Sequence, residues 1–214
     1  MIKGLIFDLD GVICYTDQYH YRAWKQIADR EGIPFDEKVN DRLRGVSRME
    51  SLNIILEAAK RTYTEDEKQQ MAAEKNDVYR TLLRQMGPAD LSDQVLDTLN
   101  TLKMQGYQLA IGSSSKNAGM ILERIGLGDF FHAVSDGNNI TRSKPDPEVF
   151  LCAAKMLGLK PEDCAVVEDA EAGLDAALAG GFTAVGLGSA VKQHQADVHI
   201  DRLEELLTIP QLKQ

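Results

Sequence analysis

Short apolar runs alternate with longer helical patterns along most of this chain. Residues 2–7 (IKGLIF), 108–111 (QLAI) and 164–167 (CAVV) have the length and composition of buried strands. Weaker strand patterns lie at 132–135, 183–187 and 198–200, and helical patterns lie at 95–102, 117–125, 147–157, 170–179 and 203–207. Strands that alternate with helices of about ten residues predict an α/β fold with a doubly wound parallel sheet.

The stretch from residue 15 to residue 86 differs, because its apolar residues recur with a helical period and few β-branched residues cluster there. Two apolar stripes are formed by Ala23, Trp24, Ile27 and Ala28 and by Leu52, Ile55, Leu56 and Ala59. A long polar helix is predicted from about Glu65 to Gln85. We therefore expect a Rossmann-like core of residues 1–14 and 87–214, with an all-helical domain of residues 15–86 inserted after the first strand.

Polar side chains follow the three strongest strands of the predicted sheet. Asp8 and Asp10 come after the first strand, the serines 113–115 after the second, and Glu168 and Asp169 after the third. The carboxyl ends of parallel strands meet at one edge, where ligands bind, so these groups are expected to converge. Two unit charges about 5 Å apart repel by roughly 3 kcal/mol at an effective dielectric of about 20. A hard divalent cation with oxygen ligands, Mg²⁺, would offset this repulsion.

Two carboxylates placed two residues apart suit phosphoryl transfer. One can attack phosphorus to give an aspartyl phosphate, and the other can move a proton. The hydroxyl and backbone N–H groups of residues 113–115 can hold phosphoryl oxygens. Each motif alone also fits a structural role, such as a turn or a helix N-cap. Their ordered placement after separate strands favours catalysis.

Four segments resemble the motifs of the haloacid dehalogenase superfamily of phosphotransferases: FDLDG (7–11), IGSSS (111–115), SKPDP (143–147) and VVEDA (166–170). The resemblance covers the whole chain, and the helical insertion resembles the cap of that superfamily. It implies that Asp8 is the nucleophile and Asp10 the general acid/base. It also implies that Mg²⁺ binds to Asp8, Glu168, Asp169 and the backbone carbonyl of Asp10, with Ser113 and Lys144 on the phosphoryl group. The Lys144–Pro145 bond is often cis in such proteins.

The cap segments are similar to those of the β-phosphoglucomutases, one branch of this superfamily. The implied substrate contacts are Thr16, His20, Trp24, Gly45, Val46, Ser47, Arg48, Lys75 and Asn76 in the cap and Ser113, Ser114, Ser115, Lys116, Asn117 and Lys144 in the core. The implied reaction interconverts β-D-glucose 1-phosphate and glucose 6-phosphate through an aspartyl-phosphate enzyme and a β-glucose 1,6-bisphosphate. Such an enzyme holds two phosphates, and the guanidinium of Arg48 suits the one that is not transferred. Tyr15 departs from the pattern, because relatives commonly carry an acid there.

Three alternative functions differ from the mutase in what they require of the chain. A magnesium-dependent sugar-phosphate phosphatase of the same superfamily would share the nucleophile but admit water, and it would not need the clamp at residues 45–48. A signalling receiver would not need the inserted helical domain. A dinucleotide-binding module would carry GxGxxG after the first strand, where this chain has DLDG.

Composition narrows the partners and the compartment. The formal charge of −9, from 33 acidic and 24 basic residues, argues against binding to nucleic acid or an anionic membrane. The three cysteines lack a CxxC pair and are predicted to be buried, reduced thiols. No apolar run approaches the roughly 20 residues that span a bilayer, and the acids near the start do not fit a signal peptide. We expect a monomeric, cytoplasmic enzyme that acts on small sugar phosphates.

Overall fold

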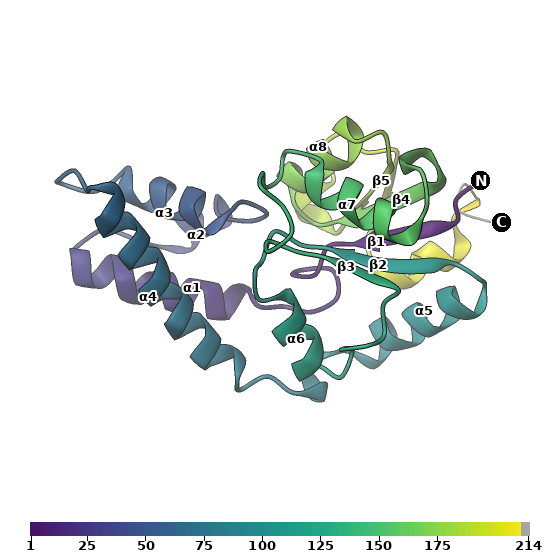
Figure 1. Cartoon of the computed structure of the whole chain (residues 1–214), viewed down its shortest axis with the longest axis horizontal. Helices are drawn as coiled ribbons and strands as arrows, with labels where there is room; N and C mark the ends of the chain where they lie inside the picture. Colours follow the sequence, from purple (N-terminus) through teal and green to yellow (C-terminus); the bar gives the residue numbers. More distant parts are fainter. Residues whose placement is uncertain (211–214) are drawn as a thin grey trace.

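Six parallel strands form one sheet in this computed structural model, which describes residues 1–210 (Figure 1). They are β1 (Gly4–Phe7), β2 (Gln108–Gly112), β3 (Ala133–Ser135), β4 (Cys164–Glu168), β5 (Thr183–Leu187) and β6 (Val198–Ile200). Their order across the sheet is β3-β2-β1-β4-β5-β6, so β1 lies at the centre and the chain winds outward in both directions. The predicted doubly wound parallel sheet is confirmed.

Both faces of the sheet are covered, which explains why its strands are apolar at successive positions. Leu5 and Phe7 of β1 belong to a cluster on the face covered by α5 (Asp93–Met104) and α6 (Ala118–Arg124). Ile6 belongs to a second cluster on the face covered by α7 (Glu148–Leu157) and α8 (Glu171–Ala179). The period of two along β1 therefore divides its side chains between two cores.

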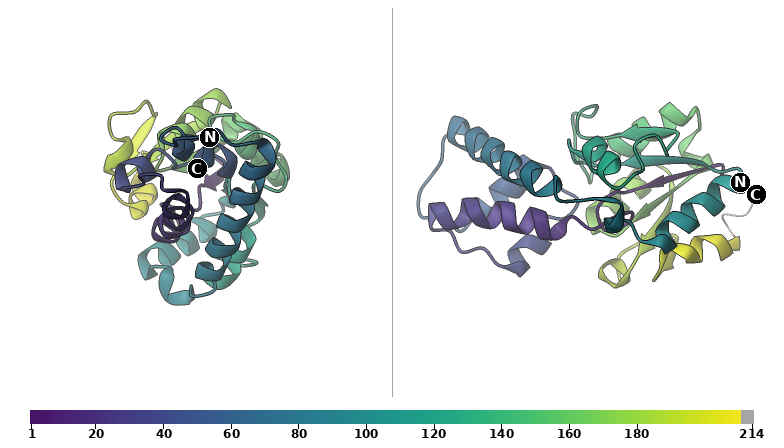
Figure 2. Two further views of the ribbon diagram at one scale, coloured as in Figure 1. Left: turned by 90° about the vertical axis from the view of Figure 1, so that its left-hand side faces the viewer. Right: turned by 90° about the horizontal axis from the view of Figure 1, so that it is seen from below.

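The cap is a separate helical lobe between β1 and β2, and Figure 2 shows it projecting from the sheet-containing lobe. It contains α1 (Asp17–Glu31), α2 (Glu37–Asp41), α3 (Arg48–Leu56) and α4 (Glu65–Leu83). The predicted stripes of α1 and α3 meet there, since Trp24 and Leu52 share one buried cluster. The helical pattern predicted for the second stripe, residues 52–59, extends beyond the helix itself. Helix α3 ends at Leu56, and Ala59 packs on the cluster from the following loop.

The two long cap helices reach beyond the cap's own cluster. Trp24 of α1 and Met71 of α4 lie in the cap cluster. Ala23 of α1 and Tyr79 of α4 belong instead to the large cluster that includes Phe7 of the central strand. The bases of α1 and α4 are therefore anchored in the core by apolar packing.

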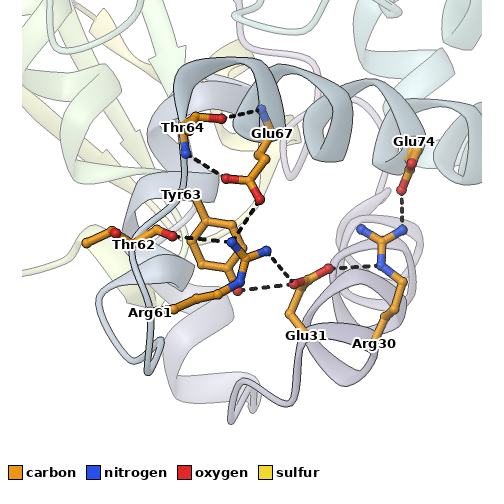
Figure 3. A network of polar contacts seen from close by, with 8 residues as sticks. All are labelled: Arg30, Glu31, Arg61, Thr62, Tyr63, Thr64, Glu67 and Glu74. Carbon is orange, nitrogen blue, oxygen red and sulfur yellow. Dashed lines mark hydrogen bonds and ion pairs between the residues drawn. The ribbon is translucent and has the colours of Figure 1, made fainter.

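A network of charged residues joins the ends of α1 and α4 at the cap surface (Figure 3). Thr64 and Glu67 form a capping box that starts α4, with Thr64 N donating to Glu67 at 2.8 Å. Arg61 from the preceding loop lies 2.8 Å from Glu67 and 3.4 Å from Glu31 at the end of α1. Arg30 of α1 pairs with a glutamate of α4. These ion pairs are exposed, so we assign them a modest stabilising role.

Two details differ from the sequence expectations. The predicted last helix at 203–207 is a 3₁₀ helix, η4 (Leu203–Thr208), one of four with η1 (Pro88–Asp90), η2 (Pro161–Asp163) and η3 (Ser189–Val191) among the described residues. Pro210 follows closely and disfavours a helical residue before it, so this segment stays short. Cys14 and Cys164 are buried and unpaired as predicted, but Cys152 is partly exposed. Within residues 1–210, no helix is long and apolar enough to cross a membrane.

Candidate active site

The carboxyl ends of β1, β2 and β4 bring the predicted catalytic groups to one edge. Phe7 pairs in register with Ile111 of β2 and with Val167 of β4, so the residues that follow them lie side by side. Asp8 therefore comes level with Glu168. The convergence expected from the strand order is confirmed.

Lys144 lies fully buried between two carboxylates. Its Nζ donates to Asp8 Oδ1 at 2.5 Å and to Glu168 Oε1 at 2.6 Å. Burial opposes the charge of Lys144, but Asp8 and Glu168 outweigh it and raise the pKa of the ammonium group. The ammonium group is therefore held charged beside the proposed nucleophile. The peptide bond between Lys144 and Pro145 is cis, as the resemblance implied.

The carboxylates of Asp8, Glu168 and Asp169 form a candidate cation site. One ligand oxygen from each lies within 4.8 Å of the others. Burial and the neighbouring Glu168 raise the pKa of Asp169 to about 8, so this site disfavours a third negative charge without a cation. A dense set of oxygen ligands fits Mg²⁺. The carboxylate of Asp10 is outside this group, and the predicted role of its backbone carbonyl stays a prediction.

Two glycines make room for these carboxylates. A Cβ at Gly11, whose φ is +90°, would lie 2.0 Å from Asp169 Oδ2. A Cβ at Gly173, in the first turn of α8, would lie 1.8 Å from Glu168 Oε1. Glu168 also accepts a hydrogen bond from the N–H of Ala170 at 2.9 Å. The carboxylates thus rest directly against backbone, which fixes their positions.

Asp10 is held by the first turn of the cap rather than by the cation site. Thr16 donates to it twice, from its backbone N–H and from its hydroxyl, at 2.6 Å each. The Tyr79 hydroxyl donates in turn to Thr16 at 3.0 Å. Burial and the nearby charge of Asp17 raise the pKa of Asp10 to about 7. A carboxyl group that titrates near neutrality can both give and accept a proton, which suits a general acid/base.

Buried Lys75 and half-buried His20 form a second pair beside Asp10. Lys75 Nζ lies 2.8 Å from His20 Nδ1, and His20 Nε2 lies 3.9 Å from Asp10. Lys75 also packs over the rings of Trp24 and Tyr79. Burial lowers the pKa of both bases, and the charge of nearby Arg48 lowers them further. Lys75 is only 2% exposed, although it belongs to a helix that is mostly polar in sequence.

Two hydrogen bonds join the cap to the serine loop of the core. Ser114 Oγ donates to the carbonyl of Gly45 at 3.3 Å, and Asn117 Nδ2 donates to Asn76 Oδ1 at 2.9 Å. Ser47 caps the start of α3 by accepting the N–H of Glu50, which places Arg48 at its first position. Burial lowers the pKa of the half-buried Arg48.

One cavity of about 580 Å³ lies between the two lobes and contains most of the predicted site. Its lining includes Asp8, Asp10, His20, Trp24, Gly45, Val46, Ser47, Arg48, Lys75, Ser113, Ser114, Ser115, Lys116, Asn117, Lys144, Glu168 and Asp169. Thr16 and Asn76 are not in the lining, and they act from behind it through their bonds to Asp10 and Asn117. Carboxylates of the core and cations of the cap therefore face a common space.

Comparison with known proteins assigns the family. The model of the haloacid dehalogenase-like hydrolases matches residues 2–181. The chain belongs to this family. The resemblance seen in the four sequence motifs is confirmed.

Relatives of this haloacid dehalogenase-like enzyme include mutases and phosphatases. It is 44% identical over 207 residues to a β-phosphoglucomutase of Bacillus subtilis, covering 96% of this chain and 92% of the relative. A fructose-1-phosphate phosphatase of Escherichia coli is 32% identical, covering 85% and 94%. The crystal structure of a β-phosphoglucomutase from Clostridium difficile superposes with a TM-score of 0.90 at 39% identity, covering 96% and 93%. The helical insertion between β1 and β2 is the cap of this family.

The structure adds three residues to the site of this haloacid dehalogenase-like enzyme. Arg44 pairs with Asp17 and lies 3.6 Å from Asp169, so it connects the cap to the cation site. Tyr79 supports Asp10 through Thr16 and packs 4.1 Å from the His20 ring. Arg44 directly precedes the Gly45 segment, which was the available signal in the sequence. Asp17 had no signal beyond its place at the start of α1.

Proposed function

We propose that this enzyme is a β-phosphoglucomutase, which interconverts β-D-glucose 1-phosphate and glucose 6-phosphate. The observation that supports it best is the shared cavity, which Asp8 and Lys144 line from the core and Arg48 lines from the cap. An anion at each end of one sugar can then be bound at the same time. The similarity to the Bacillus subtilis β-phosphoglucomutase points to the same reaction.

In the proposed reaction, Asp8 and Asp10 act on opposite sides of the phosphorus–oxygen bond. Phosphorylated Asp8 gives its phosphoryl group to the 6-hydroxyl of β-glucose 1-phosphate, while the carboxylate of Asp10 takes the hydroxyl proton. The bisphosphate then turns over in the cavity. Asp8 attacks the phosphorus at C1, the bond to the sugar oxygen breaks, and Asp10 returns the proton to that oxygen. A pKa of about 7 allows Asp10 to serve in both directions.

The other groups hold the phosphoryl group and the sugar. Lys144 lies beside Asp8 and neutralises charge on the transferred oxygens. When bound to Asp8, Glu168 and Asp169, Mg²⁺ would supply charge stabilisation for the phosphoryl oxygens. Arg48 binds the phosphate that is not transferred, and Lys75 and Asn76 bind sugar hydroxyls. The contacts of Ser114 and Asn117 with the cap exclude water, which keeps the phosphoenzyme from hydrolysis.

A coupled assay with Mg²⁺, β-glucose 1-phosphate and a trace of glucose bisphosphate tests the proposal. Formation of glucose 6-phosphate is followed, and free phosphate is measured in the same samples. We expect rapid glucose 6-phosphate with little free phosphate. Free phosphate without isomerisation would favour the alternative, a magnesium-dependent sugar-phosphate phosphatase. The Escherichia coli relative is a fructose-1-phosphate phosphatase. The assignments of Asp8 and Asp10 would then stand, and those of Arg48 and Lys75 would not.

A further inference from the structure

The second connection between cap and core is fastened by Arg124, the last residue of α6. Its Nε donates to the carbonyl of Met86 at 2.9 Å, and its Nη2 donates to the carbonyls of Arg84 and Met86 at 2.7 and 2.6 Å. These carbonyls follow directly on α4, at an end where helix geometry leaves carbonyl groups without intrahelical partners. A positive charge is also favourable at that end of the helix. One core side chain thus binds the base of α4.

Helix α6 meets α4 at both of its ends. At its start, Asn117 donates to Asn76 at 2.9 Å. At its end, Arg124 binds the carbonyls of residues 84 and 86. Asn117 lines the cavity, whereas Arg124, Arg84 and Met86 do not. The inner contact therefore lies at the cavity, and the outer contact lies away from it.

The outer contact is suited to hold the base of α4 in a fixed position. Three hydrogen bonds from a planar guanidinium fork constrain direction as well as distance. Met86 is 1% exposed and belongs to the core cluster, so the carbonyl that Arg124 binds is held from its other side by apolar packing. The inner contact is one amide–amide bond, which a substrate can replace. Opening of the cap thus costs least when Asn76 leaves Asn117 and the base of α4 stays in place.

We propose that Arg124 is a positioning residue that fixes the point about which the cap closes. It holds the base of α4 to the core, so that closure brings Asn76 to Asn117 and Arg48 to the cavity. Arg124 acts through the cap and touches no substrate. The expected effect on catalysis rests on the proposed function. If the cap closes in a displaced position, water reaches phosphorylated Asp8 and hydrolyses the aspartyl phosphate.

The lifetime of the phosphoenzyme tests this role without any sugar. The full-length enzyme with Mg²⁺ is phosphorylated by acetyl phosphate, and loss of the aspartyl phosphate is followed after the donor is removed. We expect Arg124→Met to shorten the lifetime by about tenfold and Arg124→Lys, which keeps the charge but not the fork, to lie between it and the wild type. Arg84→Met is the matched control, because the exposed side chain changes while the carbonyl that Arg124 binds remains. Equal lifetimes in all four proteins would overturn the proposal.

A second measurement separates positioning from a general loss of structure. For β-glucose 1-phosphate, Arg124→Met should raise KM and lower kcat together, while the rate at which acetyl phosphate phosphorylates Asp8 is unchanged. Equal losses with both donors would show a purely structural role and overturn the proposal. If wild-type enzyme forms no phosphoenzyme, the proposed function fails. In that case, hydrogen exchange of the backbone amides at 84–90 tests the role of Arg124. Faster exchange in Arg124→Met, but not in Arg84→Met, supports the proposal that Arg124 fixes the base of α4, and unchanged exchange refutes it.

Discussion

Replacing Gly173 by alanine should destabilise this protein, although alanine is the better helix former. A Cβ at this position would lie 1.8 Å from Glu168 Oε1 and 2.0 Å from its Cδ, where ordinary contacts begin near 3.4 Å. Glu168 must therefore move by about 1.6 Å. It cannot do so and keep its bonds to Lys144 at 2.6 Å and to the N–H of Ala170 at 2.9 Å.

The size of the effect follows from those two bonds. A hydrogen bond to a charged group contributes about 1.5–3 kcal/mol, and alanine gains up to about 1 kcal/mol over glycine in a helix. We therefore expect Gly173→Ala to lower the free energy of unfolding by about 2–5 kcal/mol. Gly119 is the matched control, because it also lies in the first turn of a helix, is exposed, and has no heavy atom within 4 Å of a built Cβ. Gly119→Ala should stabilise by up to about 1 kcal/mol.

Thermal and urea unfolding of the two variants, with a chelator present, measures this contrast. In a chain of this size, 1 kcal/mol shifts Tm by about 2–4 °C, so Gly173→Ala should lower Tm by about 4–20 °C and Gly119→Ala should raise it slightly. If Gly173→Ala is as stable as Gly119→Ala, Glu168 is not held against α8, and the account of the carboxylate site is wrong.

Three further predictions concern the site. Asp8→Asn should abolish phosphoryl transfer and leave the circular dichroism spectrum unchanged, and turnover near wild type would remove the nucleophile assignment. Arg48→Ala should reduce mutase turnover by about 100-fold and hydrolysis of acetyl phosphate far less, whereas equal losses would contradict the role of Arg48 at the distal phosphate. The lowered pKa of half-buried His20 makes the unfolded chain bind a proton below pH 6.5 that the folded chain does not, so its contribution to stability, present above pH 6.5, falls as the pH is lowered below it. The difference in unfolding free energy between wild type and His20→Gln, measured from pH 8 to pH 5, should shrink toward acid pH, and a constant difference would refute the pKa assignment.

The sheet and the cluster of carboxylates at its edge could be predicted from the sequence because both follow from local patterns. Buried parallel strands are short apolar runs, and residues such as Asp8 and Glu168 follow them directly. The cap was predictable as a helical insertion for the same reason. The hydrophobic period identifies the strands and helices, and the place of a residue directly after a strand identifies the edge of the sheet. Both can be read from the sequence.

Contacts between distant segments could not be predicted in the same way. Lys75 reads as part of a polar helix, yet it lies four residues after Met71 and four before Tyr79, on their buried face. That spacing was a signal for burial, but only the packing against Trp24 shows that the face lines a cavity. Arg124 gave no signal at all, because its partners are backbone carbonyls of residues 84 and 86.

The packing of α1 and α4 limits how this cap could be transplanted by protein engineers. A chimaera cut at the ends of the insertion would carry Ala23 and Tyr79 away from the strand residues that complete their cluster, including Phe7. The cap cluster around Trp24 and Leu52 would move intact, but the helix bases would meet a foreign surface. A portable unit would have to include the core residues beneath those bases, or the recipient would have to be redesigned to match them. The insertion is one continuous segment of the sequence, but the cluster in which its helix bases pack also includes residues of the core.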